Sequence, residues 1–219
     1  MSGDAALRSY HLGVDLGQRK DHTAIVVVEQ RVECTGARDA ATFEYVRVRK
    51  FVVVRVEQVR LGTRYSSIVD RVETIAAALA GTGATLTIAI DATGLGGVVT
   101  EDLRRRRLGG ELLPVVSTGG NEGRYADGFF MTPKVELMMG LLRAFEVEGL
   151  CVAEGVAGWE LLEEELMGMR KVTGRAGMKF VSAGKHDDLV MALGLALFGA
   201  RRRQLPVEAG AILRRREAW

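Results

Sequence analysis

The first third of the chain has the composition and patterning of β-strands. β-Branched and aromatic residues dominate segments 10–15, 23–28 and 42–59, as is typical of strands. Gly17 allows a tight turn after the first segment, and the charged and small residues of 32–41 predict a loop. We therefore expect a three-stranded antiparallel meander, in which 42–59 forms either one long strand or a strand with a bulge.

From residue 65 onward, apolar residues recur at the spacing of helices. Ile68, Val69, Val72 and Ile75 fall on one helical face, and Gly81 ends this pattern. The same reasoning predicts helices at 65–79, 98–107, 133–148, 159–169 and 186–203, strands at 85–91 and 111–116, a hairpin at 169–182 and a mobile glycine-rich loop at 117–128. Alternating strands and helices predict an α/β fold that contains a right-handed β-α-β crossover.

Composition narrows the class of protein. The chain has 219 residues, of which 47% are apolar and 26% charged, with a formal net charge of +2; this is ordinary for a globular α/β domain. We expect one domain at 1–203 and a C-terminal tail at 204–219. No apolar run is long enough to span a bilayer and no signal peptide is recognisable. Cys34 and Cys151 have no partner at metal-ligand spacing, so both are expected to be reduced, in a cytoplasmic setting.

Carboxylates occur at the ends of three predicted elements. Asp15 ends the first strand, Asp91 ends the strand at 85–91, and Asp187 and Asp188 begin the last helix. If the first strand is central, the strands that end at Asp15 and Asp91 are neighbours, and a helix packed on the sheet can bring its first residues to the same place. The simpler alternatives are a turn-forming role for Asp15 and a helix-capping role for Asp187 or Asp188.

Converging carboxylates repel one another unless a cation lies among them. Oxygen ligands are those that Mg²⁺ and Mn²⁺ prefer, and two such ions about 3.5–4 Å apart form a known arrangement for phosphodiester cleavage. The pattern of acids therefore predicts a site for two Mg²⁺ or Mn²⁺ ions and a hydrolase that acts on nucleic acid.

The order of elements and acids resembles the ribonuclease H-like superfamily, and three short motifs resemble the nuclease domain of phage terminase large subunits. The motifs are Gly13-Val-Asp-Leu-Gly17 with Asp21-His-Thr-Ala-Ile25, then Ile90-Asp-Ala-Thr-Gly94 with Gly96-Gly97, and finally Gly184-Lys-His-Asp-Asp-Leu-Val-Met-Ala-Leu193. The resemblance spans residues 10–203. It implies a central mixed five-stranded sheet, with three antiparallel and two parallel strands, flanked by helices, and an extra β-hairpin before the last helix.

The resemblance also implies a metal-dependent endonuclease that cuts double-stranded DNA during viral genome packaging. Asp15, Asp91 and one of Asp187 and Asp188 match the metal-binding acids of the family, and the sequence leaves open which of the last two binds. Many relatives carry a further acid where this chain has Met191. The implied partners are a terminase ATPase domain, the small terminase subunit and the portal, in the cytoplasm of a bacterial host. No Gly-x-x-x-x-Gly-Lys-Ser/Thr motif for ATP occurs in the sequence.

DNA requires positive charge beside the acids. The candidates for backbone contacts are Lys20, Lys134, Lys171, Arg175, Lys179 and Lys185. The resemblance makes the hairpin a DNA-contacting flap, whereas ordinary surface charge is the simpler interpretation of each cation. His186 is a candidate to contact a phosphate or to cap the helix. Nothing in the pattern predicts base-specific recognition.

Three other functions compete with this interpretation. Actin-like sugar kinases and chaperone ATPases also have an Asp-x-Gly turn after a first strand, but they need two such domains and have no role for the last helix. A Holliday-junction resolvase or another ribonuclease H-like nuclease fits the same acids. A non-catalytic DNA-binding or assembly module would not require all three acidic positions to be filled.

Overall fold

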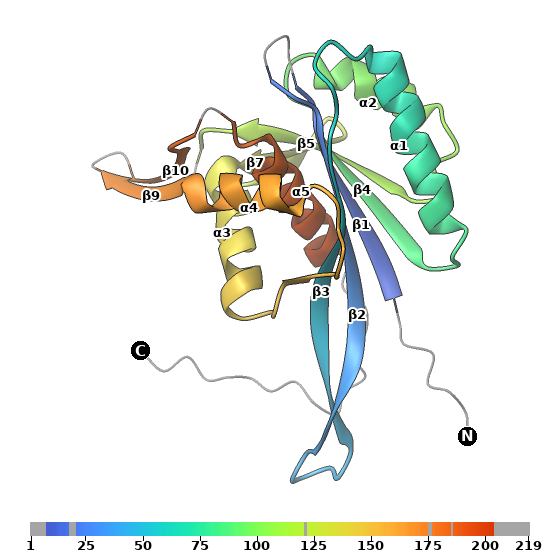
Figure 1. Ribbon diagram of the computed structural model, residues 1–219, viewed down its shortest axis with the longest axis vertical. Helices are drawn as coiled ribbons and strands as arrows, with labels where there is room; N and C mark the ends of the chain where they lie inside the picture. Colours follow the sequence, from blue (N-terminus) through green and yellow to red (C-terminus); the bar gives the residue numbers. More distant parts are fainter. Residues whose placement is uncertain (1–7, 18–20, 121, 175–176, 185, 204–219) are drawn as a thin grey trace.

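The computed structural model describes residues 8–17, 21–120, 122–174, 177–184 and 186–203. The main sheet contains β1 (Arg8–Asp15), β2 (Ala24–Arg38), β3 (Tyr45–Gln58), β4 (Thr85–Asp91), β5 (Glu111–Thr118), β6 (Arg124–Ala126), β7 (Phe129–Pro133) and β8 (Cys151–Val152). Its order is β6-β7-β5-β4-β1-β2-β3-β8, with β1 in the interior (Figure 1). A separate two-stranded sheet pairs β9 (Met169–Gly174) with β10 (Gly177–Ser182).

The predicted fold class is confirmed, but the predicted number of strands is wrong. The expected five strands are present as β3-β2-β1-β4-β5, with β1, β2 and β3 antiparallel and β4 and β5 parallel to β1. Three short strands, β6, β7 and β8, extend this core to eight. β6 lies inside the segment 117–128, which was predicted to be a loop. At three residues it is too short for a period-two pattern to reveal it.

The predicted loop at 32–41 is wrong because β2 continues to Arg38 and pairs with β3 along this length. Together the two strands form an arm that projects beyond the body of the molecule (Figure 1). A two-stranded ribbon faces solvent on both sides, so its strands need no alternation of apolar and polar residues. Ion pairs support it instead, with Glu33 contacting Arg31 at 3.1 Å and Lys50 at 2.6 Å. Of the two alternatives for the third strand, one long strand or a strand with a bulge, the structure shows the second: the pairing with β3 has a register shift between Val27 and Val28.

Helices cover both faces of the sheet (Figure 1). α1 (Tyr65–Ala80) and α2 (Gly96–Arg104) pack on one face, where they share an apolar core with Leu12, Val14 and Ile88. α3 (Lys134–Glu146), α4 (Trp159–Gly168) and α5 (Asp188–Arg202) pack on the other face around Ala24, Val26 and other residues. All five predicted helices are therefore present, with ends that differ by a few residues.

α5 is the central helix of its layer. Every residue from Asp188 to Ala200 is buried, as expected for a helix that is apolar on all sides. It lies directly on β1, because Gly13 has no side chain: a Cβ there would collide with the backbone carbonyl of Ala192. On β4, Thr87 similarly packs against Gly199, where a Cβ would lie 2.6 Å from the threonine hydroxyl. This close approach fixes the first turn of α5 beside the end of β1.

Both cysteines, Cys34 and Cys151, are free thiols. Among the described residues, no helix combines the length and the apolar character that crossing a membrane would require.

Candidate active site

Two of the predicted acids lie at adjacent strand ends. β1 and β4 are parallel neighbours, with Val14 opposite Ile90 in the register, so the next residues, Asp15 and Asp91, emerge side by side at one edge of the sheet. The backbone N–H of Thr93 donates a 2.8 Å hydrogen bond to Asp91. This contact fixes the turn that leads into α2 and holds the Asp91 carboxylate at the end of its strand.

The other two acids come from the start of α5. Asp187 occupies the N-cap position, yet its side chain caps no amide among the described residues. Its Oδ2 instead accepts a 2.6 Å hydrogen bond from Lys134 Nζ, at the start of α3. Asp188 Oδ2 accepts a 3.1 Å hydrogen bond from the backbone N–H of His22. Of the pair, Asp188 is the more buried.

The four acids lie close enough to perturb one another. Burial raises the pKa of Asp15 well above its usual range, and the negative charges of Asp91, Asp188 and Asp187, in that order, raise it further. A hydrogen bond with the Asp91 carboxyl adds to this effect. Burial also raises the pKa of Asp188, although the hydrogen bond from the His22 N–H opposes the shift. Such a cluster holds excess negative charge that a cation would neutralise.

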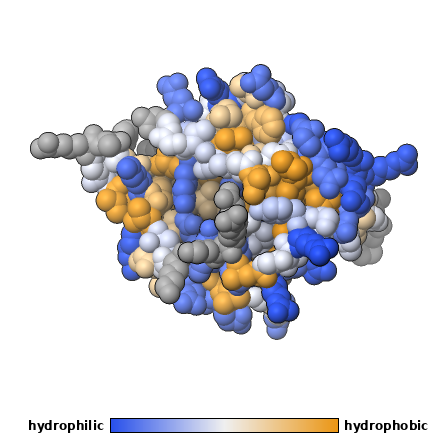
Figure 2. Space-filling model, turned by 90° about the horizontal axis from the view of Figure 1, so that it is seen from above, coloured by the Kyte–Doolittle hydropathy of each residue, from blue (hydrophilic) through white to orange (hydrophobic). Residues whose placement is uncertain are grey.

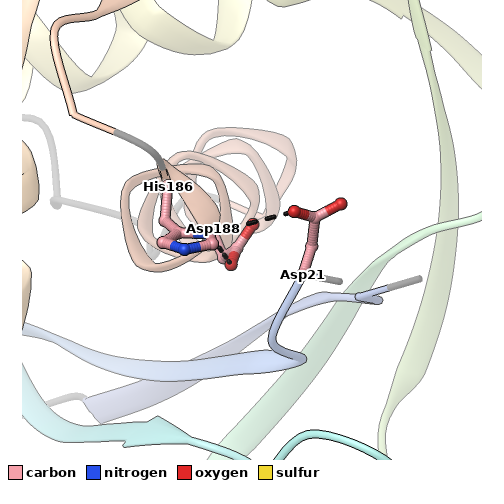
Figure 3. A group of neighbouring side chains, drawn as sticks. All are labelled: Asp21, His186 and Asp188. Atoms are coloured by element: carbon pink, nitrogen blue, oxygen red, sulfur yellow. Dashed lines mark ion pairs between the residues drawn. The ribbon is translucent and has the colours of Figure 1, made fainter. Parts of the chain in front are cut away.

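A second group of side chains adjoins the first through Asp188. Asp21, from the turn before β2, and His186, just before α5, point toward Asp188 (Figure 3). His186 Nδ1 lies 3.8 Å from an oxygen of each carboxylate, which is too long for a hydrogen bond. This buried nitrogen has no hydrogen-bond partner among the described residues. The ligand atoms of the three side chains lie within 4.8 Å of one another, a spacing that can hold a metal ion.

Asp21 and Glu165 are acids near the site that sequence reasoning missed as site residues. Asp21 lies in a turn closed by a 3.1 Å hydrogen bond from the Gly17 N–H to Thr23 Oγ1. Its position just before β2, the strand that pairs with the end of β1, could have indicated that it lies near Asp15. Glu165 lies on α4 and reaches the first turn of α5. No local pattern distinguishes it from its exposed acidic neighbours on the same helix.

The predicted DNA-binding cations have different positions in the structure. Lys134 lies at the site, where it pairs with Asp187. Lys171 and Lys179 are exposed on the β9–β10 hairpin. Lys20, Arg175 and Lys185 lie outside the described residues. Figure 2 views the end of the molecule at which β1 terminates, where hydrophilic residues are interspersed with hydrophobic patches.

Among solved structures, the chain is similar to the large terminase nuclease from thermophilic phage G20c. The match has a TM-score of 0.50 and 19% sequence identity, and it covers 86% of this chain and 81% of that one. The chain has a terminase nuclease-like fold. It is also similar to the g2p large terminase nuclease domain from bacteriophage SPP1 with bound Mn, with a TM-score of 0.49, 10% identity and coverage of 89% and 86%. No protein-family model and no curated protein matches the sequence.

Proposed function

We propose that the protein is a divalent-metal-dependent endonuclease that hydrolyses phosphodiester bonds of double-stranded DNA. The observation that carries this proposal is the convergence of Asp15, Asp91, Asp187 and Asp188 from three separate elements of a terminase nuclease-like fold. Burial and neighbouring carboxylates raise the pKa values of Asp15 and Asp188, so these two acids cost folding free energy when ionised unless a cation neutralises the cluster. Acids retained in so unfavourable an arrangement support a catalytic role rather than a structural one.

The donor set fits two metal ions of the Mg²⁺ or Mn²⁺ class. Asp15, Asp91, Asp187 and Asp188 would surround one ion, and Asp188 would share the second with Asp21 and His186. Carboxylate oxygens suit these ions, and the unpaired Nδ1 of His186 supplies a nitrogen donor already directed at two carboxylates. When bound, two such ions supply activation of a water molecule and stabilisation of charge on the scissile phosphate.

The remaining side chains of the site would bind and orient DNA. Lys134 pairs with Asp187, so its ammonium group lies beside the acids and would contact a phosphate bound there. Lys171 and Lys179 would contact the DNA backbone from the hairpin, together with Lys20, Arg175 and Lys185. Backbone contacts of this kind fix position without reading sequence, so cleavage is expected to depend weakly on sequence.

The fold supports a wider setting in viral genome packaging. In this proposal residues 1–203 form the nuclease domain and 204–219 a tail, and the domain acts in the cytoplasm of a bacterial host. The 219-residue sequence contains no phosphate-binding loop of the Gly-x-x-x-x-Gly-Lys-Ser/Thr type, so ATP hydrolysis would come from a terminase ATPase domain. The small terminase subunit and the portal would complete the machinery.

Plasmid cleavage tests the proposal. Supercoiled plasmid is incubated with wild type or Asp91→Asn in Mn²⁺, Mg²⁺ or EDTA, and nicked and linear products are quantified. We expect nicking with either metal, none in EDTA, and loss of nicking in the folded variant. Equal cleavage by Asp91→Asn and wild type would contradict the assignment of the site, and metal-independent cleavage would contradict the mechanism.

A further inference from the structure

The first turn of α5 has an unusual cap. The first N–H groups of a helix lack partners within the helix, and an Asp at the N-cap position commonly accepts from the second or third of them. Asp187 occupies this position with φ −140° and ψ 23°. Its carboxylate nevertheless turns away, toward Lys134 at 2.6 Å. The usual capping residue is therefore not the one that satisfies these amides.

Glu165 replaces it from a different helix. Its Oε2 accepts hydrogen bonds from the backbone N–H groups of Leu189 at 2.9 Å and Val190 at 3.2 Å. These are the second and third residues of α5, the positions that an N-cap side chain normally serves. A carboxylate there also interacts favourably with the positive end of the helix dipole. Leu162, fully buried one turn earlier, anchors α4 so that Glu165 is held in reach.

The consequence concerns the two aspartates. With its amides already satisfied, α5 does not compete for the side chain of Asp187. Asp188 is also free of the helix and faces the His22 backbone. Both carboxylates thereby remain free of the α5 amides, with Asp187 beside Lys134 and Asp188 beside the His22 backbone. If the cap were lost, Asp187 could satisfy the exposed amides by a side-chain rotation, which would remove it from the cluster.

We propose that Glu165 is a positioning residue, which caps α5 in place of Asp187 and so keeps Asp187 and Asp188 available to bind metal. This inference rests on the proposed nuclease function. The role requires no contact between Glu165 and DNA or ions, because Glu165 acts on the site by capping the first turn of α5.

Three variants test the proposal. Glu165→Ala removes both hydrogen bonds, whereas Glu165→Gln keeps an oxygen that can accept them and loses the charge. Glu164→Ala is the matched control, because Glu164 is an exposed acid on the same helix. Mn²⁺ binding is measured by electron paramagnetic resonance, which needs no catalytic turnover. The amide resonances of Leu189 and Val190 are followed by NMR in Mg²⁺-free and Mn²⁺-free buffer.

We expect Glu165→Ala to raise the Mn²⁺ dissociation constant about tenfold, the usual cost of losing a group that orients metal ligands. Plasmid cleavage should lose kcat by a similar factor while KM for DNA stays unchanged. For Glu165→Gln, the Mn²⁺ dissociation constant and kcat should remain within about threefold of the wild-type values. For Glu164→Ala, both should equal the wild-type values. The Leu189 and Val190 amide protons should shift most in Glu165→Ala and least in the control.

The outcomes separate this inference from the proposed function. Wild-type Mn²⁺ affinity in folded Glu165→Ala would overturn the positioning role alone. A defect in Glu165→Gln as large as in Glu165→Ala would also overturn it, because charge rather than capping would then matter. If Glu165→Ala does not fold, a loss of Mn²⁺ affinity of about tenfold or more in Glu165→Gln, which keeps the hydrogen-bond acceptor, would contradict the capping role. A wild type that binds no Mn²⁺ would overturn the proposed function and the positioning role with it.

Discussion

Two buried polar groups on one face of β1 behave in opposite ways. His11 and Asp15 are four residues apart and therefore point to the same side of the sheet, with Gly13 between them against α5. His11 is fully buried, and Asp15 partly so. The hydrogen-bond partners of His11 are neutral, complementary groups, whereas Asp15 is surrounded by three other carboxylates.

The neighbours of His11 complete the hydrogen bonds of its ring, whereas the buried Nε2 of Gln30 in the same cluster has no partner among the described residues. Ser9 donates to Gln30 Oε1 at 3.1 Å, so its hydroxyl oxygen is free to accept from His11 Nε2 at 2.9 Å. His11 Nδ1 then accepts from the Thr87 hydroxyl at 2.7 Å. A neutral imidazole, with one donor and one acceptor, fits these partners. Burial lowers the pKa of His11 from 6.5 to about 4; a hydrogen bond with Gln30 opposes the shift, and the charge of Arg203 adds to it.

The protein groups around Asp15 do not balance the negative charge of its cluster. Burial and three neighbouring carboxylates all raise the pKa of Asp15, and Lys134 offsets only the charge of Asp187 by a direct contact. The contrast is useful because both clusters are polar and lie beneath the same helix. A buried group whose neighbours complete its hydrogen bonds contributes to folding, while one whose neighbours repel it is typical of a functional site.

The strongest test of this contrast is Asp15→Asn. We expect DNA cleavage to fall on the order of 10³-fold. The substitution removes a charged carboxylate from the proposed metal site, and the neutral amide oxygen of asparagine is a poor replacement for it. In EDTA at neutral pH, the free energy of unfolding should instead rise by about 1 kcal/mol, because the raised pKa means that ionised Asp15 destabilises the folded state. Plasmid cleavage and urea denaturation measure the two effects.

The contrast between Asp15 and His11 would be wrong if Asp15→Asn lowered both DNA cleavage and the free energy of unfolding in EDTA. A variant that is less stable than wild type in EDTA and also inactive would indicate that Asp15, like His11, is a structural residue. Circular dichroism at the assay temperature provides the necessary check that the variant is folded when cleavage is measured.

His11→Gln tests the other end of the strand. The pKa of His11 is lower in the folded protein than in the unfolded chain, so between pH 6.5 and 4 the unfolded state binds a proton that the folded state does not. Stability from this residue is therefore complete above pH 6.5 and falls as the pH drops toward 4. The loss is about 3 kcal/mol, from a pKa difference of about 2.5 units.

The difference in pH dependence of stability between wild type and His11→Gln isolates the contribution of His11. The free energy of unfolding is measured by urea denaturation at pH 7.5 and pH 4.5 for wild type and His11→Gln, and the other titrating groups cancel in the difference. Wild type should lose more stability than the variant on acidification, and cleavage by the variant at pH 7.5 should remain near that of wild type. Parallel pH profiles would show that the buried network does not depend on a neutral imidazole.

The sequence predicted the strand ends well because an acid that interrupts an apolar strand is a local signal. Asp15 and Asp91 follow runs of β-branched residues, and parallel pairing then requires that they be neighbours. The capping of α5 could not be foreseen in this way. Asp187 occupies an ordinary N-cap position, and only the tertiary structure shows that Glu165, 22 residues earlier in the sequence, makes the cap instead.

The errors in the fold have a similar origin. The arm formed by β2 and β3 is stabilised by pairing between two strands that are both exposed to solvent, so segment 32–41 lacks the apolar alternation by which a half-buried strand is recognised. Asp21 was missed as a site residue because turns commonly contain aspartate. Its distinction is spatial: the turn carries it toward His186 and Asp188, which are far away in the sequence.

The smallest expected effect concerns the cation that already lies among the acids. Lys134→Met removes the charge that pairs with Asp187, so the cluster becomes one unit more negative. Because Lys134 is partly exposed, its ion pair should contribute less than about 1 kcal/mol to the free energy of unfolding. Mn²⁺ should then bind up to about threefold more tightly, since the pair no longer competes with the ion. Lys179→Met, on the hairpin, is the control and should leave Mn²⁺ affinity unchanged. Weaker Mn²⁺ binding in Lys134→Met would mean that the lysine holds Asp187 in its binding position. Neighbouring protein groups would then stabilise the Asp15 cluster more than the comparison with His11 implies.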